Sequence, residues 1–229
     1  QCYSSAASDV YKRQPLDLRI NTFIMQHSSI TYDRYDIAPT PNKFNPSHIS
    51  ARDISAHISV KALKKDSLDI IVKKFSLKEQ SGLNLTRLTF HLNANNSEAS
   101  LQKFCLKMPG TELNLNDVTA TYRTDNDRLQ AGTLKFSGST VQSSVTLSDF
   151  AFILPTLRHF DDKWDVAAAF RGTDTDVSIS HFGISSKSGE LKVDAYGRIT
   201  NLNATPRWHV TIRDISIAPE LSARIGKSI

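Results

Sequence analysis

Residues 145–154 read VTLSDFAFIL, and this stretch is the basis of our fold prediction. Counted from Val145, its apolar side chains fall at offsets 0, 2, 5, 7 and 9, with the polar pair Ser148-Asp149 between them. Successive side chains of a strand alternate faces, so offset 5 would point away from offsets 0 and 2. A β-bulge places two residues opposite one and returns offsets 5, 7 and 9 to the first face. The stretch therefore predicts one bent strand that is apolar on one face.

The same spacing recurs along most of the chain. Full copies begin at Ile49, Leu83 and Leu113, around the polar pairs Arg52-Asp53, Thr86-Arg87 and Asn116-Asp117. Shorter copies begin at Leu18, Ile30, Val177 and Val210, and looser ones at Leu68, Ala99, Leu129, Trp164 and Leu191. The copy at Leu68 places Lys73 at an apolar offset. These thirteen starts give a period of about 16 residues, and a fixed period is typical of a repeat architecture.

A different interpretation makes each polar pair a two-residue hairpin turn, because Asn-Asp and Ser-Asp are turn-like. It would leave strands of about three residues, shorter than the usual five or six. We therefore favour the bulge. The best helical pattern, over Ser59–Ile71, would give only a short helix, and Pro155–Lys163 predicts a short helical turn or a sheet corner. Residues 38–48, with three prolines, predict an ordered loop between strands.

Composition excludes several classes of protein. The 229 residues are 39% hydrophobic with a mean hydropathy of −0.31, unlike a membrane bundle or a disordered chain. No apolar run approaches the roughly 20 residues of a spanning helix. The net charge of +5 is mild, and the lysines between Lys61 and Lys107 are interleaved with acidic residues and lack an aromatic series. We therefore expect no nucleic-acid partner.

The two ends of the chain differ from the rest. Residues 1–14, QCYSSAASDVYKRQ, have no periodicity and resemble translated sequencing-adapter sequence, so we expect a non-native segment there. We expect residues 15–229 to form one segment of repeated strands that belongs to a longer protein. Without Cys2, Cys105 has no disulfide partner, and its offset faces outward.

Few residues carry the pattern of a catalytic or metal site. His159 lies close to Asp161 and Asp162, and a histidine beside carboxylates can act as a general base or a metal ligand. No nucleophile motif, glycine-rich phosphate loop or ligand spacing accompanies it. Asp174 and Asp176 lack the rest of a calcium loop. We therefore predict no catalytic residue, metal site or cofactor, and expect that the chain is not an enzyme.

The repeated strands predict an all-β fold, a long antiparallel meander. At about 4.8 Å between strands, the sheet would extend on the order of 60 Å, with a large apolar face that monomers avoid exposing to water. It could fold into a sandwich, close into a barrel or curl into an open hydrophobic trough. Bulges at matching positions favour the trough. The predicted lining residues are Leu85, Leu88, Phe90, Leu115, Val118, Leu147, Phe150, Phe152, Ile179, Phe182, Ile212 and Ile215.

Three phrases of the chain resemble a known family. They are SSITYD (28–33), LNLNDVTATY (113–122) and HVTIRDISI (209–217), and together with the repeated strands they resemble TamB/AsmA-like proteins of the Bacteroidetes over nearly all of residues 15–229. The resemblance implies a rolled β-sheet whose hydrophobic groove bridges the cell envelope. It also implies an inner-membrane anchor, which we expect to precede this segment, and a periplasmic location.

The resemblance leaves two functions open. In the first, phospholipid acyl chains are the ligand, and the groove carries phospholipid between the inner and outer membranes. In the second, the chain is a scaffold for outer-membrane protein insertion, with an assembly-type β-barrel protein as partner and client strands paired to its sheet edges. A dry, self-packed sandwich is the third alternative.

Overall fold

The computed structural model describes residues 18–219 except 42, 65, 126–127 and 187–188, so the predicted non-native segment 1–14 lies outside the described residues. The strands are β1 (Leu18–Asp33), β2 (His48–Lys64), β3 (Ser67–Glu79), β4 (Asn84–Asn95), β5 (Glu98–Lys107), β6 (Glu112–Thr121), β7 (Thr124–Asp125), β8 (Arg128–Leu129), β9 (Lys135–Thr140), β10 (Ser143–Thr146), β11 (Lys163–Thr173), β12 (Val177–Ser186), β13 (Leu191–Thr200) and β14 (Arg207–Ile217). Two short 3₁₀ helices are η1 (Leu147–Phe150) and η2 (Pro155–His159).

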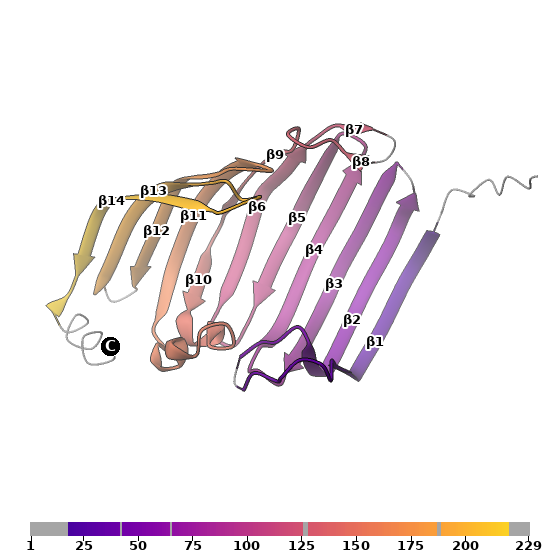
Figure 1. Cartoon of the computed structure of the whole chain (residues 1–229), viewed down its shortest axis with the longest axis horizontal. Helices are drawn as coiled ribbons and strands as arrows, with labels where there is room; N and C mark the ends of the chain where they lie inside the picture. Colours follow the sequence, from indigo (N-terminus) through magenta and orange to yellow (C-terminus); the bar gives the residue numbers. More distant parts are fainter. Residues whose placement is uncertain (1–17, 42, 65, 126–127, 187–188, 220–229) are drawn as a thin grey trace, which may run out of the picture.

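Twelve of these strands form one antiparallel sheet (Figure 1). Its order is β1 to β6, then β10 to β14, with β9 paired to both β6 and β11. The strands β7 and β8 form a separate small hairpin. The predicted all-β fold and long antiparallel meander are therefore confirmed, whereas the curling of the sheet into an open trough stays a prediction.

The bulges lie where the sequence spacing places them in seven strands. Register shifts between neighbouring strands put the extra residue at the pairs Asn21-Thr22, Arg52-Asp53, Thr86-Arg87, Gln102-Lys103, Asn116-Asp117, Ser180-His181 and Arg213-Asp214. At Asp53, Lys103 and Asp117 the backbone φ is 54°, 53° and 51°. This left-handed conformation explains the polar pairs, because aspartate and asparagine adopt it more readily than apolar residues do.

The stretch from which the repeat was read, residues 145–154, is not a bent strand. β10 ends at Thr146 and the chain turns into η1. The amide of Ser148 donates to the Phe160 carbonyl (3.0 Å), and Asp149 Oδ2 accepts from the Gly110 amide (2.9 Å). The polar pair therefore lies in a 3₁₀ helix, which is neither the predicted bulge nor the two-residue hairpin turn of the alternative interpretation.

The bulge next to β10 lies earlier in the chain than predicted, between β9 and β10. β9 and β10 both pair antiparallel with β6 and β11, so they act as one strand interrupted at Val141-Gln142. Gln142 has a φ of 42°, and the Val141 amide donates to the Asn114 carbonyl (3.0 Å). This bulge escaped the sequence pattern because its flanking inward positions, Thr140 and Ser143, are polar.

Several looser copies are also wrong. In β3 the bulge lies at Lys73-Lys74, two residues later than predicted, so that both lysines face outward. The copy at Ile30 begins inside β1, and the one at Leu129 begins in the small hairpin. Those at Trp164 and Leu191 fail because β11 and β13 alternate without a bulge of their own. The helix considered for Ser59–Ile71 is a β hairpin, whereas η2 confirms the helical turn after Pro155.

One face of the sheet is apolar from β1 to β14. Residues directly opposite each other on neighbouring strands share a face. One such row consists of Met25, Ala56, Phe75, Leu88, Leu106 and Leu113, and another of Ala168, Phe182, Ala195 and Ile212. Phe136 of β9 connects the two halves through Ala120 and Gly172. We call this side the hydrophobic face and the other side the outer face.

Candidate functional site

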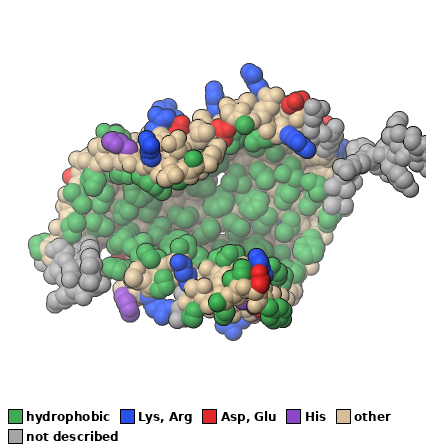
Figure 2. Space-filling view, viewed as in Figure 1, with side chains coloured by type: hydrophobic (Ala, Val, Ile, Leu, Met, Phe, Trp, Pro, Cys, Tyr) green, Lys and Arg blue, Asp and Glu red, His purple; other side chains and the backbone are tan. Residues whose placement is uncertain are grey.

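The hydrophobic face is hollowed, and hydrophobic side chains cover its floor between two rims that carry charged side chains (Figure 2). Most of its side chains are only half-buried, and its buried apolar residues among the described residues are few: Ala51, Ile54, Ala56, Val72, Met108, Leu191 and Ala195. Globular domains normally bury such a face against a second layer. Within the described residues no second sheet or long helix packs on it.

The structure brings nine of the twelve predicted lining residues together on this face. They are Leu85, Leu88 and Phe90 on β4, Leu115 and Val118 on β6, Ile179 and Phe182 on β12, and Ile212 and Ile215 on β14. The first seven are half-buried, whereas Ile212 and Ile215 on the edge strand are 55% and 53% exposed. That they touch a ligand stays a prediction.

The other three lining residues belong to a rim of the face. Leu147 and Phe150 lie on η1, and Phe152 follows it, with the rings of Phe150 and Phe152 stacked at 6.5 Å between centroids. The Phe152 carbonyl accepts from the Phe44 amide (2.8 Å), so the β1–β2 loop meets η1 at the lower end of the sheet (Figure 1). Two segments far apart in sequence therefore form one rim.

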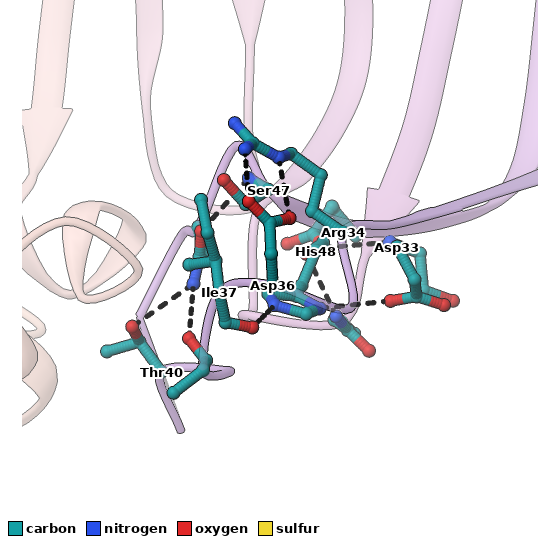
Figure 3. Close-up of polar contacts among 12 residues, drawn as sticks. Asp33, Arg34, Asp36, Ile37, Thr40, Ser47 and His48 are labelled. Atoms are coloured by element: carbon teal, nitrogen blue, oxygen red, sulfur yellow. Dashed lines mark hydrogen bonds and ion pairs between the residues drawn. The ribbon is translucent and has the colours of Figure 1, made fainter.

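The β1–β2 loop is held in place by His48, which the sequence analysis did not single out (Figure 3). Its Nδ1 lies 3.1 Å from Asp33 Oδ1 and its Nε2 lies 2.6 Å from the Ile37 carbonyl oxygen. Both partners accept, so the ring satisfies them when both nitrogens donate. The side chain is only 12% exposed. These contacts confirm the prediction of an ordered loop over residues 38–48.

A second polar contact of this loop faces solvent. Arg34 forms a two-pronged ion pair with Asp36, and its guanidinium lowers the pKa of the Asp36 carboxyl chiefly through that hydrogen bond. Both side chains are largely exposed. His48, rather than this exposed pair, is therefore the anchor of the loop.

The outer face carries small or polar residues next to the lining positions. Thr119, Gly183 and Ser216 each follow a lining residue and face the opposite side, because strand side chains alternate. Cys105 also faces outward, as predicted, and burial raises the pKa of its thiol. A hollow of about 670 Å³ on this face over β10–β13 is lined by charged and polar side chains. His181 Nδ1 lies 3.4 Å from Asp194 Oδ1, which has no hydrogen-bond partner among the described residues, and Lys192 forms an ion pair with Asp214 (3.3 Å).

The residues considered for catalysis or metal binding lie in two separate places, at the end of η2 and in the turn between β11 and β12. His159 and Asp161 are exposed at the end of η2, and Asp176 forms an ion pair with Arg198 (3.3 Å). The described residues contain no group of three or more histidine, cysteine or acidic side chains that could hold a metal ion. Nor does any helix among them have the length and apolar character needed to cross a bilayer.

Comparison of the chain with protein-family models, with curated proteins and with solved structures finds no match.

Proposed function

We propose that this chain is a segment of an envelope-spanning, AsmA/TamB-like protein whose hydrophobic face carries phospholipid between the inner and outer membranes. The observation behind this proposal is an apolar face that runs across eleven strand positions, on which no second layer packs within the part of the chain that the structure describes. In this proposal the face is an open trough and the protein is not an enzyme. It works in the periplasm, attached to the inner membrane by an anchor outside this segment.

Acyl chains suit this face better than a compact ligand does. Eleven strands at about 4.8 Å spacing make it roughly 50 Å long. Each methylene moved from water to an apolar surface contributes about 0.8 kcal/mol, so a long face gains affinity with chain length without any specific polar contact. Residues such as Val118 and Phe182 supply apolar surface but no donor or acceptor. A lipid can therefore occupy many positions along the face with similar affinity.

Neighbouring residues on opposite faces provide a direct test. Photo-crosslinking amino acids at Val118, Phe182 and Ile215 should capture phospholipid in cells, because these residues lie on the hydrophobic face. The same group at Thr119, Gly183 and Ser216, one residue further along each strand, should capture distinctly less. Equal capture at both sets would refute the proposal.

A matched pair of charge substitutions tests transport itself. Val118→Asp places an unpaired carboxylate on the hydrophobic face, where its desolvation opposes passage of an acyl chain. Thr119→Asp adds the same group on the exposed outer face. We expect phospholipid bound to the purified protein, measured by mass spectrometry, to fall in the first variant and to persist in the second. Equal loss in both would contradict the lipid function.

The second candidate is the assembly scaffold, for which the edge strand β14 is the favourable observation. Beyond its one ladder to β13, β14 pairs with no other described strand, and its Trp208 is 71% exposed. An edge of this kind can pair with a client strand. Crosslinkers along β14 that capture outer-membrane proteins, with none capturing lipid at Val118, would favour the scaffold.

A further inference from the structure

Basic side chains gather on the outer face of β2–β5, on the opposite side of the sheet from the hydrophobic face. We call this group the basic patch. It consists of Arg52, Lys73, Lys74, Lys78, Arg87, Lys103 and Lys107. All except the half-buried Lys107 are exposed.

The bulges create the patch. A bulge leaves both residues of the polar pair on one side of the sheet, because the apolar residues before and after it return to the other side. In β3, Val72 and Phe75 lie on the hydrophobic face, so Lys73 and Lys74 both face outward. Arg87 and Lys103 occupy the second positions of the bulges in β4 and β5. The bent strands thus bring basic residues from four neighbouring strands together.

The cross-strand pairing within the patch is unfavourable for the isolated sheet. Arg52 lies directly opposite Lys78, and Arg87 directly opposite Lys107. Like charges at directly opposed positions destabilise a sheet. Nothing in the packing of this exposed face requires them, so an external anion offers a physical reason for the arrangement.

Two carboxylates offset part of this charge. Asp53 pairs with Lys78 (3.0 Å) and Glu112 with Lys107 (2.9 Å), and these hydrogen bonds lower the pKa of both carboxyls. The other five basic residues form no ion pair with a described residue. They are Arg52, Lys73, Lys74, Arg87 and Lys103. The patch therefore keeps a net positive charge.

The outer face of β11–β14 is different. There Arg198 pairs with Asp176 and Lys192 pairs with Asp214. Asp165 and Asp194 add further negative charge among the basic residues. The excess of unpaired positive charge is therefore greater on β2–β5 than on β11–β14.

We propose that the basic patch docks this protein on the surface of an anionic phospholipid bilayer. Groups of four to eight lysine and arginine residues bind anionic leaflets through their headgroups. The patch spreads over two dimensions, about 15 Å across four strands and about as far along β3 between Lys73 and Lys78. A flat charged surface matches this shape.

The three phenylalanines of β2–β5, Phe75, Phe90 and Phe104, all lie on the hydrophobic face. The patch therefore lacks the aromatic rings that a single-stranded nucleic acid would stack on.

The docking is separate from the proposed carriage of lipid. Headgroups contact the outer face, whereas acyl chains would occupy the hydrophobic face on the other side of the same strands. Each of the two functions can accordingly be removed without the other.

Vesicle sedimentation tests the docking. The wild-type chain should bind vesicles that contain phosphatidylcholine and phosphatidylglycerol more tightly than vesicles of phosphatidylcholine alone. The uncharged vesicles measure the binding that arises from the hydrophobic face without anionic headgroups. Salt should weaken this preference, because it screens exposed charges. The double variant Lys74→Glu/Lys103→Glu should lose the preference by about tenfold or more.

The matched control is Lys135→Glu/Arg171→Glu, which makes the same change in net charge at exposed outer positions of β9 and β11. It should keep the preference to within about twofold, because it leaves the patch intact. The proposal would be overturned by an equal loss in the control variant or by a wild-type chain without a preference for anionic vesicles. It would also be overturned if the wild-type chain bound DNA but showed no such preference.

Two variants separate this proposal from the carriage of lipid. Val118→Asp should keep the vesicle preference, and the Lys74→Glu/Lys103→Glu variant should still yield lipid crosslinks at Val118, so the two proposals fail independently.

Discussion

At Lys103 a long basic side chain occupies a backbone conformation that glycine, asparagine and aspartate adopt more readily. Asp53 and Asp117 occupy the matching position in the bulges of β2 and β6. Their φ is nearly the same as that of Lys103, but aspartate adopts this conformation more readily. The polar pairs that mark most bulges could therefore be predicted from sequence. The pair at Lys73-Lys74 was misplaced although the residues mark it: a frame that begins at Ile70 puts Val72, Phe75 and Leu77 at apolar offsets, whereas the frame from Leu68 put Lys73 at one. Gln142 was missed for a different reason, since the inward positions on either side of its bulge, Thr140 and Ser143, are polar.

Replacing Lys103 with glycine should relieve this backbone cost. The left-handed conformation costs an ordinary residue about 1–2 kcal/mol, and glycine loses about 0.5–1 kcal/mol through its greater freedom in the unfolded chain. We therefore expect Lys103→Gly to raise the free energy of unfolding by up to about 1 kcal/mol in urea titrations. Ser100→Gly, in the same strand at an ordinary φ, should lower it. A loss of equal size in both variants would argue against the backbone explanation.

Among the elements, β10 with η1 shows where sequence spacing fails. Offsets alone fit residues 145–154 to a bent strand, but the turn depends on contacts with Gly110 and Phe160, whose positions are set by other parts of the fold. The nine strand-borne lining residues were predictable because alternation is local. The rim was not, because His48 anchors it through a carbonyl eleven residues away in sequence.

His48→Ala should loosen the β1–β2 loop at its contact with η1. The substitution removes the ring that contacts the Asp33 carboxylate and the Ile37 carbonyl, and loss of such a buried partner costs about 1–3 kcal/mol. We expect faster hydrogen exchange at the Phe44 amide, which donates to Phe152. Arg34→Ala removes only an exposed ion pair and should leave that exchange rate nearly unchanged. Slow exchange in both variants would show that the loop does not depend on His48.

Apart from the small β7–β8 hairpin, the strands that the structure describes form one sheet, and the buried apolar residues of this part of the chain are few. The slope of unfolding free energy against urea concentration scales with the surface exposed on unfolding. Because no second layer covers the hydrophobic face within the described residues, we expect this slope to be smaller than for two-layer domains of equal length. A slope equal to theirs would mean that the hydrophobic face is covered in solution.

The number of strand positions in the sheet has a consequence for contacts between copies. Neighbours alternate in direction, and the path from β1 to β14 contains eleven strands, so its first and last strands run the same way. A copy shifted by translation would bring β14 against a parallel β1, which is the less stable pairing. A two-fold axis perpendicular to the sheet joins β14 to β14, or β1 to β1, in the antiparallel sense and keeps the apolar side continuous. Pairing of two copies through one edge therefore gives a closed dimer, and a filament would need two-fold pairing at both edges.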